Sequence, residues 1–315
     1  MIAWLKMLLA VGLALGAVLT GLGWLAEWWP ALDIFNNGLP ALAAGSLVLF
    51  LLALLTRDWR AIALAGLLAA INIGLIFAGL QGAAAEATPG SKRFLRVATF
   101  NVWFDNYRID GIDRFLNDTD ADVVVLQEVT KDHLGPLHRG LDARYPYNVG
   151  DFGIVIFSKY PINGDGRVDR PGYPEWIRLL ARWVELDVNG TAVELVGVHL
   201  ARPFYPVLQE HDVTSLIQFV LTRKLPLIVA GDFNMTPWTD QLKQFTRTTG
   251  LGRFNNFHFT WPMRWRKYPF VPLVAIDNVF ASPAFAKIGA IGGPRLGSDH
   301  RPVIADIALA RPAAN

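Results

Sequence analysis

Three long apolar segments without a charged side chain fill most of the first 80 residues of this chain. They cover residues 7–25, 39–55 and 61–80. Each is about long enough to cross the ~30 Å hydrocarbon core of a bilayer as a helix. Four tryptophans lie at the segment ends: Trp24, Trp28, Trp29 and Trp59. Because tryptophan concentrates at the membrane–water interface, we predict a membrane anchor over residues 1–85 with three transmembrane helices.

The first segment has a second interpretation as a cleaved signal peptide, with the other two segments forming a helical hairpin. Only Lys6 precedes this segment as a basic residue, and no convincing small-residue cleavage site follows it. The length and the lack of charge of all three segments favour three transmembrane helices.

Charges in the loops predict the orientation of the anchor. Lys6 precedes the first segment, the loop after it carries Glu27 and Asp33, and Arg57 and Arg60 lie between the second and third segments. Since basic loops stay in the cytoplasm, the N-terminus and the second loop are predicted to be cytoplasmic. Three crossings of an inner or plasma membrane then place the rest of the chain in the periplasm or outside the cell.

The chain changes character after the third apolar segment. Small and polar residues at 81–91 mark a boundary, so we expect a linker at residues 86–93 and a separate domain over residues 94–315. The absence of cysteine excludes disulfide bonds and thiolate metal ligands. Beyond residue 90 the basic residues outnumber the acidic ones by only three, which is too few to indicate nucleic-acid binding from charge alone.

Short apolar runs separated by turn residues predict that strands dominate this second domain. Strands are expected at residues 95–100, 123–126, 154–157, 183–188, 193–198, 227–230, 274–280 and 303–307. Helices are expected at residues 109–116 and 207–221. This mixture predicts a layered α/β (α+β) domain.

The tetrapeptide Gly231-Asp232-Phe233-Asn234 directly follows an apolar run at residues 225–230 that is typical of a buried strand. Chemistry in α/β folds concentrates at the C-terminal ends of such strands. If the extended geometry continues, Asp232 and Asn234 point to the same face. A carboxylate and an amide placed together can orient a water molecule and hold a phosphate oxygen.

Further polar motifs lie next to other predicted strands. They are Asn101, Gln127-Glu128, His199, Asp277-Asn278 and Ser298-Asp299-His300. Each alone has an ordinary explanation as a turn, a cap or a solvated strand end. Together they supply carboxylates, amides and two histidines, a set that suits Mg²⁺, Mn²⁺ or Ca²⁺ better than zinc. A divalent cation and a histidine base are the parts required for phosphoester hydrolysis.

In this order the motifs resemble those of the endonuclease/exonuclease/phosphatase (DNase I-like) superfamily, over roughly residues 94–308. The resemblance implies a four-layer αββα sandwich, in which two mixed sheets pack face to face with helices outside. It also implies a metal-dependent phosphoester hydrolase of phosphodiesterase or nuclease type, here in a membrane-anchored, bacterial-type member.

The resemblance implies roles for a metal-binding group and a histidine pair. Glu128 matches the main metal ligand, and Asn101 and Asp299 would complete the metal shell directly or through water. His300 matches the histidine that activates water or contacts the scissile phosphate. Asp277 matches the carboxylate that orients this histidine.

Three more residues match positions next to the reacting phosphate. Asp232 and Asn234 match the pair that positions the nucleophile and the phosphate. His199 matches a second histidine, which would protonate the leaving group or bind phosphate.

Two loops are candidates for substrate binding. The segment at residues 260–268 interleaves cations with aromatic side chains and includes Trp261, Arg264 and Arg266, while Arg202 follows His199. This mixture suits stacking on bases and contact with phosphates, and equally an interfacial contact at the level of lipid headgroups. A surface loop that packs its tryptophans on the sheet edge is the structural alternative.

Three functions therefore stay open. The first is a membrane-tethered phosphodiesterase acting on nucleic acid. The second is the same chemistry on a phospholipid or sphingolipid headgroup, as in a sphingomyelinase. The third is a non-catalytic scaffold that keeps the fold, which is disfavoured because every matched catalytic position is retained. The membrane and a phosphoester substrate are the implied partners, and no protein partner is indicated.

Overall fold

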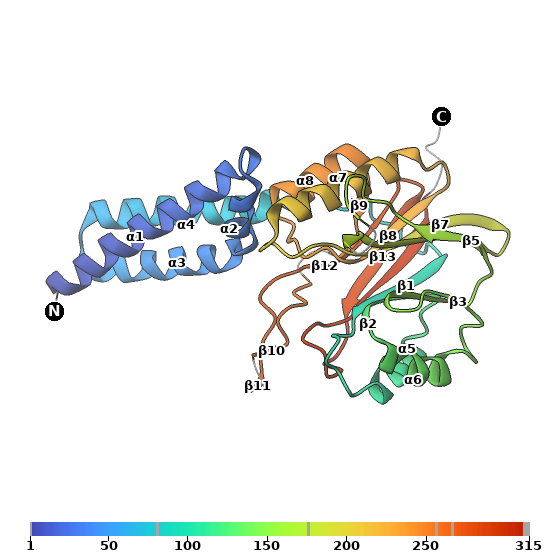
Figure 1. Cartoon of the computed structure of the whole chain (residues 1–315). Helices are drawn as coiled ribbons and strands as arrows, with labels where there is room; N and C mark the ends of the chain where they lie inside the picture. The colour runs from blue at the N-terminus through green and yellow to red at the C-terminus, as the bar shows by residue number, and fades with distance from the viewer. Residues whose placement is uncertain (1, 80–81, 175–176, 256–257, 266–267, 311–315) are drawn as a thin grey trace.

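The computed structural model describes residues 2–79, 82–174, 177–255, 258–265 and 268–310, and it divides into a helical bundle and a layered domain (Figure 1). The bundle consists of α1 (Ile2–Trp24), α3 (Leu39–Thr56) and α4 (Trp59–Ala78). All three helices are long and apolar enough to cross a membrane. The prediction of three long apolar helices is thus confirmed.

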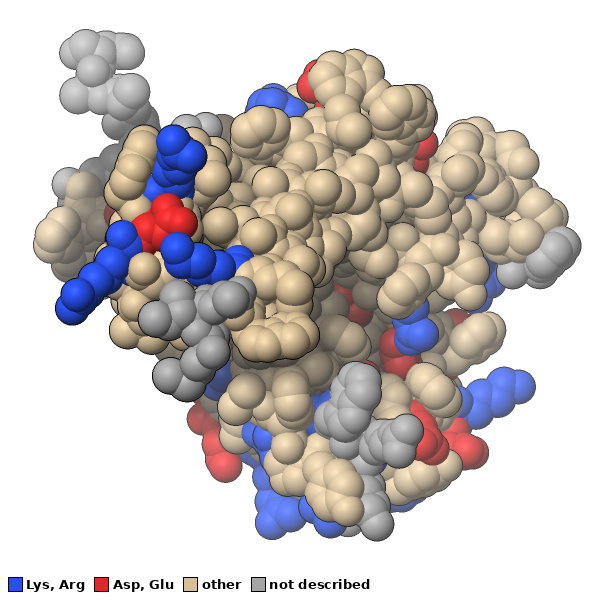
Figure 2. Space-filling view, turned by 90° about the vertical axis from the view of Figure 1, so that its left-hand side faces the viewer, with Lys and Arg blue, Asp and Glu red and all other residues tan. Residues whose placement is uncertain are grey.

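The bundle exposes apolar side chains instead of burying them. Large side chains such as Leu55 and Phe77 are mostly exposed, which is the expected surface for helices surrounded by lipid. Lys6 forms an ion pair with Asp58 at the end of the bundle away from the layered domain. Viewed from that end, the bundle is almost free of charge apart from one cluster of basic and acidic side chains (Figure 2).

Short helical segments connect α1 to α3. They are η1 (Leu25–Glu27), η2 (Pro30–Leu32) and α2 (Asp33–Asn37). They lie at the end of the bundle that abuts the layered domain (Figure 1).

The layered domain is built on two six-stranded sheets. The first has the order β13 (Phe285–Gly292), β14 (Val303–Leu309), β1 (Leu95–Asn101), β2 (Val123–Val129), β4 (Gly153–Ser158), β3 (Tyr147–Val149). The second has the order β5 (Ile162–Arg167), β6 (Leu180–Val188), β7 (Thr191–His199), β8 (Leu227–Asp232), β12 (Asp277–Ala281), β9 (Gly252–Arg253). A small two-stranded sheet of β10 (Arg264–Trp265) and β11 (Tyr268–Pro269) stands apart from both.

Three apolar cores hold the layers together. Alternate residues of the two sheets, among them Val125 and Ile228, form the core between them. A second core lies under α7 (Pro206–Thr222) and α8 (Asp240–Thr249), and a third under α5 (Asp110–Thr119) and α6 (Lys131–Leu141). Since each strand alternates its side chains between two faces, both sheets are covered on both sides. This is the αββα sandwich that the resemblance implied.

The elements differ from the predictions in several places. The strands β3, β5, β9, β10, β11 and β13 were not predicted. Helices α6 and α8 were not predicted, because Pro136 and two glycines interrupt the apolar spacing of α6 and only two large apolar residues mark α8. Strand β12 begins at Asp277 instead of residue 274. Residues 83–87 run along the sheets, where Ala84 and Ala87 donate backbone hydrogen bonds to Arg253 and Lys287.

Candidate active site

The polar motifs meet at one edge of the sandwich because of strand direction and register. Strands β1 and β2 are parallel, and so are β7 and β8, so their C-terminal ends lie at the same edge. His199 stands opposite Asp232 in the β7–β8 register, and Asp277 stands opposite Asp232 in the antiparallel β8–β12 register. His300 lies in the segment before β14, which pairs with β1. We call this the catalytic edge.

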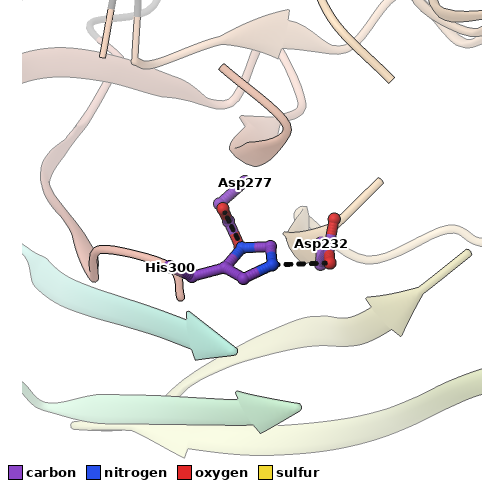
Figure 3. Close-up of side chains that lie close together, drawn as sticks. All are labelled: Asp232, Asp277 and His300. Atoms are coloured by element: carbon purple, nitrogen blue, oxygen red, sulfur yellow. Dashed lines mark hydrogen bonds and ion pairs between the residues drawn. The ribbon is translucent and has the colours of Figure 1, made fainter. Parts of the chain in front are cut away.

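His300 lies between two carboxylates, as Figure 3 shows. Its Nδ1 is 2.8 Å from Oδ2 of Asp277, and its Nε2 is 3.8 Å from Oδ2 of Asp232. Burial alone would lower the pKa of His300, but the negative charges of Asp277 and Asp232 outweigh it and raise the pKa to about 10. Burial, followed by repulsion from Asp277, raises the pKa of Asp232. The protonation states of the three side chains therefore depend on one another.

Glu128 stands on a β-bulge at the end of β2, with the left-handed backbone angle φ of 56°. Its Oε1 accepts a hydrogen bond from Nδ2 of Asn101 (3.2 Å), and its Oε2 accepts one from the backbone N–H of Phe104 (3.1 Å). Burial opposes ionisation, yet the charge of His199 and these hydrogen bonds lower the pKa of Glu128. The bulge thus aims an ionised carboxylate into the site.

Asn101 and His199 bridge the two carboxylates nearest the centre. The buried amide Nδ2 of Asn101 donates to both Glu128 and Asp232, at 3.2 Å and 3.1 Å. Nε2 of His199 lies 3.7 Å from Oε1 of Glu128 and 3.7 Å from Oδ2 of Asp232. Predicted site residues from four strands are thereby brought into one cluster.

Asp299 lies beside this cluster and contacts Trp261, which belongs to the candidate substrate-binding segment that begins at residue 260. Its Oδ2 accepts a hydrogen bond from Nε1 of Trp261 (3.2 Å), while its buried Oδ1 has no hydrogen-bond partner among the described residues. Oδ1 of Asp277 is likewise buried and unpartnered there. Buried carboxylate oxygens without a partner are costly, which is a sign of groups that bind something else.

The expectation that Asp232 and Asn234 extend from one strand face is wrong. Strand β8 ends at Asp232, and Asn234 has a left-handed φ of 51°. The backbone N–H of Asn234 donates to Oδ1 of Asp232 (2.8 Å), and its side-chain Nδ2 donates to the carbonyl of Leu200 (2.9 Å). Asn234 therefore holds the carboxylate of Asp232 through its main chain and ties the loop after β7 to the loop after β8.

The candidate substrate-binding residues lie at the mouth of the site. Nη2 of Arg202 is 3.4 Å from Oε1 of Glu128, although the Arg202 side chain is more than half exposed. The guanidinium of Arg264 lies over the ring of Trp103, 4.3 Å from its centroid. Arg266 lies outside the described residues. A pocket of about 460 Å³ beside the site is lined by Trp103, Arg264 and Ser298, among others.

Sequence reasoning assigned no role to two residues that support the cluster. The hydroxyl of Ser298 donates to the carbonyl of Asn101 (2.7 Å) and accepts from the N–H of His300 (2.9 Å). The hydroxyl of Thr260 accepts from the N–H of Asp277 (3.3 Å). The polarity of these two buried residues was a signal, but only the three-dimensional arrangement identifies their partners.

The donor set fits a divalent cation. Glu128, Asp232, Asp277 and Asp299 place four carboxylates at the catalytic edge with two histidines. Atoms of Asp232, Asp277 and His300 lie within 4.8 Å of one another. Even with both histidines protonated, the carboxylate charge is in excess, and oxygen-rich clusters of this kind favour Mg²⁺, Mn²⁺ or Ca²⁺. In this structure Asn101 turns its amide nitrogen to Glu128, so it offers the carboxylate support and not a ligand oxygen.

Comparison with protein families identifies the class of this chain. Residues 98–300 match the Endonuclease/Exonuclease/phosphatase family, and the chain belongs to that family. Members of this family are phosphoester hydrolases that depend on divalent metals. A search of curated protein sequences found no match.

Solved structures share the fold at low sequence identity. An endonuclease/exonuclease/phosphatase from Bacteroides vulgatus is 20% identical, with a TM-score of 0.58 over 69% of this chain and 99% of that one. A beta toxin mutant from Staphylococcus aureus with bound magnesium ions is 17% identical (TM-score 0.53; 67% and 99% covered). Sphingomyelinase C from Streptomyces griseocarneus is 19% identical (TM-score 0.51; 67% and 98% covered).

Proposed function

We propose that this protein is a divalent-metal-dependent phosphoester hydrolase that is tethered to a membrane by α1, α3 and α4. The observation that carries the proposal is the buried arrangement of Asp277, His300 and Asp232 next to the ionised Glu128. Residues from distant parts of the chain converge there at contact distances. This density of paired ionisable groups at a strand edge is typical of a catalytic site.

The metal would bind at Glu128 and Asp299, with Asn101 holding Glu128 in place. The cation supplies charge neutralisation and polarises a phosphoryl oxygen. The identity of the cation among Mg²⁺, Mn²⁺ and Ca²⁺ is a matter for experiment. The magnesium bound in the beta toxin relative makes Mg²⁺ the first candidate.

We propose that His300 and Asp232 together activate the attacking water. Their Nε2 and Oδ2 atoms are 3.8 Å apart, which lets one water molecule contact both. Asp277 fixes the imidazole through Nδ1, so that Nε2 faces Asp232. Because His300 already carries a proton at neutral pH, Asp232 takes the proton from the water. The bond from phosphorus to the leaving oxygen breaks as the water oxygen bonds to phosphorus.

The proposal gives the remaining polar residues supporting roles. His199 faces Glu128 and Asp232 and is placed to donate a proton to the leaving oxygen. Asn234 fixes Asp232 by its backbone N–H. Arg202 and Arg264 provide positive charge at the mouth for a substrate phosphate, and Trp261 is held there by its hydrogen bond to Asp299.

For the membrane orientation we propose the one that the loop charges predict. Lys6, Arg57 and Arg60 belong to the end of the bundle away from the catalytic domain. Basic residues at that end support a cytoplasmic N-terminus. The catalytic domain then lies in the periplasm or outside the cell.

The test is a substrate panel with the purified full-length protein. Mg²⁺, Mn²⁺ or Ca²⁺ is combined with plasmid DNA, single-stranded DNA, sphingomyelin or phosphoinositides, and Glu128→Ala serves as the inactive control. Metal-dependent hydrolysis of at least one phosphoester, lost in Glu128→Ala, supports the proposal. Failure on all substrates with every metal favours the scaffold function and contradicts the proposal.

A phospholipid or sphingolipid headgroup is the second candidate substrate beside nucleic acid. Its support is the short distance along the chain between the membrane helices and the catalytic domain, because α4 ends at Ala78 and β1 begins at Leu95. The fold shared with a sphingomyelinase C adds a reason to include sphingomyelin in the panel.

A further inference from the structure

A buried polar joint connects the helical bundle to the catalytic domain. Asp33, at the start of α2, is buried and accepts backbone hydrogen bonds from Asp240 (2.8 Å) and Gln241 (3.1 Å). Its carboxylate therefore caps the N-terminus of α8 from another part of the chain. Oδ1 of Asn37 accepts a hydrogen bond from the backbone N–H of Thr236 (2.9 Å).

The end of α4 makes the other half of this joint. Nε1 of Trp238 donates to the carbonyl of Ile76 (3.1 Å), and Nη2 of Arg253 donates to the carbonyl of Gly79 (2.8 Å). Trp238 and Arg253 are buried. A Cβ at Gly79 would lie 2.3 Å from Cδ1 of Trp238, so only glycine allows this approach. A flexible tether needs none of these contacts. They indicate that the bundle is held in a fixed position against the catalytic domain.

The joint lies next to the catalytic residues. Thr236, Trp238 and Gln241 follow Asp232 and Asn234 along the chain, after the C-terminal end of β8. The bundle thus leaves the domain near the catalytic edge (Figure 1). Viewed from the bundle side, acidic side chains are visible in a hollow below the bundle (Figure 2).

Loops around the catalytic edge and the first turn of α7 expose large apolar side chains. They are Phe104, Tyr107, Phe204, Tyr205, Val207 and Val271, which we call the apolar rim. Phe204 is 76% exposed and Val271 is 66% exposed. Soluble surfaces rarely gather such side chains unless they contact a membrane or a partner. Val207 of the rim lies in α7, which contacts η2, and η2 directly follows the exposed Trp28 and Trp29. At this point the rim continues the surface that a bilayer would cover.

We propose that the joint between α2, the end of α4 and residues 236–241 fixes the catalytic edge against the bilayer. The apolar rim then contacts the lipid surface, and the substrate is a phosphoester in the headgroup of a lipid in the same membrane. This inference rests on the function proposed above and selects the lipid candidate over nucleic acid. The small excess of basic charge supports the choice, because nucleic-acid affinity depends largely on phosphate neutralisation.

The first test measures membrane contact without using activity. The chain lacks cysteine, so Val207→Cys and Val271→Cys each give a single site for a spin label on the full-length protein in lipid nanodiscs. Leu309→Cys, at the opposite end of β14 from the catalytic edge, is the matched exposed apolar control. We expect collision with oxygen to dominate at the two rim positions and collision with a water-soluble nickel chelate to dominate at residue 309. Equal nickel accessibility at all three positions overturns the proposal.

The second test separates the joint from the chemistry. In proteoliposomes, hydrolysis of the soluble diester bis(p-nitrophenyl) phosphate reports the catalytic residues, and hydrolysis of sphingomyelin or phosphoinositides in the same vesicles reports the orientation. Asp33→Ala and Asn37→Ala are expected to lower lipid hydrolysis roughly 10-fold, a typical loss for misplaced reactants, while hydrolysis of the soluble diester changes little. Glu27→Ala, an exposed acidic residue of the same connection, should leave both rates unchanged.

The outcomes distinguish the two proposals. If the wild-type protein hydrolyses neither the soluble diester nor the lipids, the proposed function is contradicted. The spin-label measurement still tests membrane contact in that case. Two other outcomes overturn the inference alone. In the first, the wild-type protein hydrolyses the soluble diester, but Asp33→Ala and Asn37→Ala lose equal activity on both substrates. In the second, the protein cleaves plasmid DNA and leaves the lipids intact.

Discussion

The central residue of the site is His300, whose imidazole is held by two carboxylates that approach from different strands. Asp277 contacts its Nδ1 and Asp232 faces its Nε2. The hydroxyl of Ser298 accepts a hydrogen bond from the backbone N–H of His300 and fixes the loop. The imidazole thus has one orientation, which is a requirement for efficient proton transfer.

Replacement of His300 tests this arrangement. We expect His300→Ala to lower phosphoester hydrolysis at least ~100-fold, the scale expected for loss of a side chain that takes part in general acid–base catalysis. His138→Ala, on the outer helix α6, is the matched histidine control and should keep normal turnover. Near-normal turnover by purified His300→Ala protein would show that the assigned centre is wrong.

Asp120 gives a prediction about pH that is independent of catalysis. The hydrogen bond from Lys159, followed by that from Arg144, lowers the pKa of Asp120 from 3.8 to about 2. Because the folded-state pKa is lowered, the stabilisation is present above pH 3.8 and is lost as the pH falls through about 2. The Asp120 side chain is half exposed, so solvent screening limits the contribution to about 1 kcal/mol or less.

The variant for this test is Asp120→Asn, since asparagine tolerates the left-handed backbone of residue 120. Its melting temperature in detergent should lie below that of the wild type at neutral pH, and the difference should vanish toward pH 2. A difference that stays constant with pH would exclude the ion pairs as its cause.

Single residues also mark where sequence reasoning reached its limit. The chemical types at Glu128, Asp232 and His300 were readable because they follow or precede apolar runs. The left-handed backbone of Glu128 and Asn234 was not, because neither residue is glycine and nothing local announces the change. The sequence therefore placed the side chain of Asn234 on the same strand face as Asp232, whereas in the structure it donates to the carbonyl of Leu200.

At the scale of elements, the strands of the catalytic edge were predictable because each is a buried apolar run bounded by polar residues. The register was not, because it depends on which runs become neighbours. The pairing of β7 with β8 places His199 opposite Asp232, and the pairing of β8 with β12 places Asp277 there as well. Helices α6 and α8 escaped prediction because their apolar spacing is interrupted or short.

Gly231 gives the prediction for this pairing. A Cβ at residue 231 would lie 1.9 Å from the backbone carbonyl oxygen of Val198, so Gly231→Ala must separate β7 from β8. We expect destabilisation of about 1–3 kcal/mol or more, the range for strained backbone sites. Thermal unfolding measures it, with Gly289→Ala, where the Cβ meets nothing within 4 Å, as the control. Equal melting temperatures of the two variants would contradict the close pairing.

At the scale of the whole molecule, the joint between bundle and domain was invisible to sequence reasoning. Residues 81–91 suggested a simple linker, yet Ala84 and Ala87 bond to the sheets, and Asp33 caps a helix more than two hundred positions away along the chain. Such contacts join segments with no local signal for each other. The apolar runs, in contrast, predicted the three helices directly.

Membrane orientation is a prediction at this scale. The basic end of the bundle is expected in the cytoplasm, so a C-terminal alkaline phosphatase fusion should be active and a C-terminal green fluorescent protein fusion exported by the general secretory route should be dark. The opposite pair of signals would place the catalytic domain in the cytoplasm. Fusions after Arg57 serve as the control, because that loop is expected on the cytoplasmic side.

The most direct test of the central claim is the metal dependence of phosphodiester hydrolysis by the full-length protein. The protein is treated with EDTA, assayed on bis(p-nitrophenyl) phosphate, and then titrated with Mg²⁺, Mn²⁺ or Ca²⁺. The carboxylates around Glu128 and Asp299 predict no turnover after EDTA and saturable recovery with at least one of these cations. Full turnover in excess EDTA would contradict a metal-dependent phosphoester hydrolase at this site.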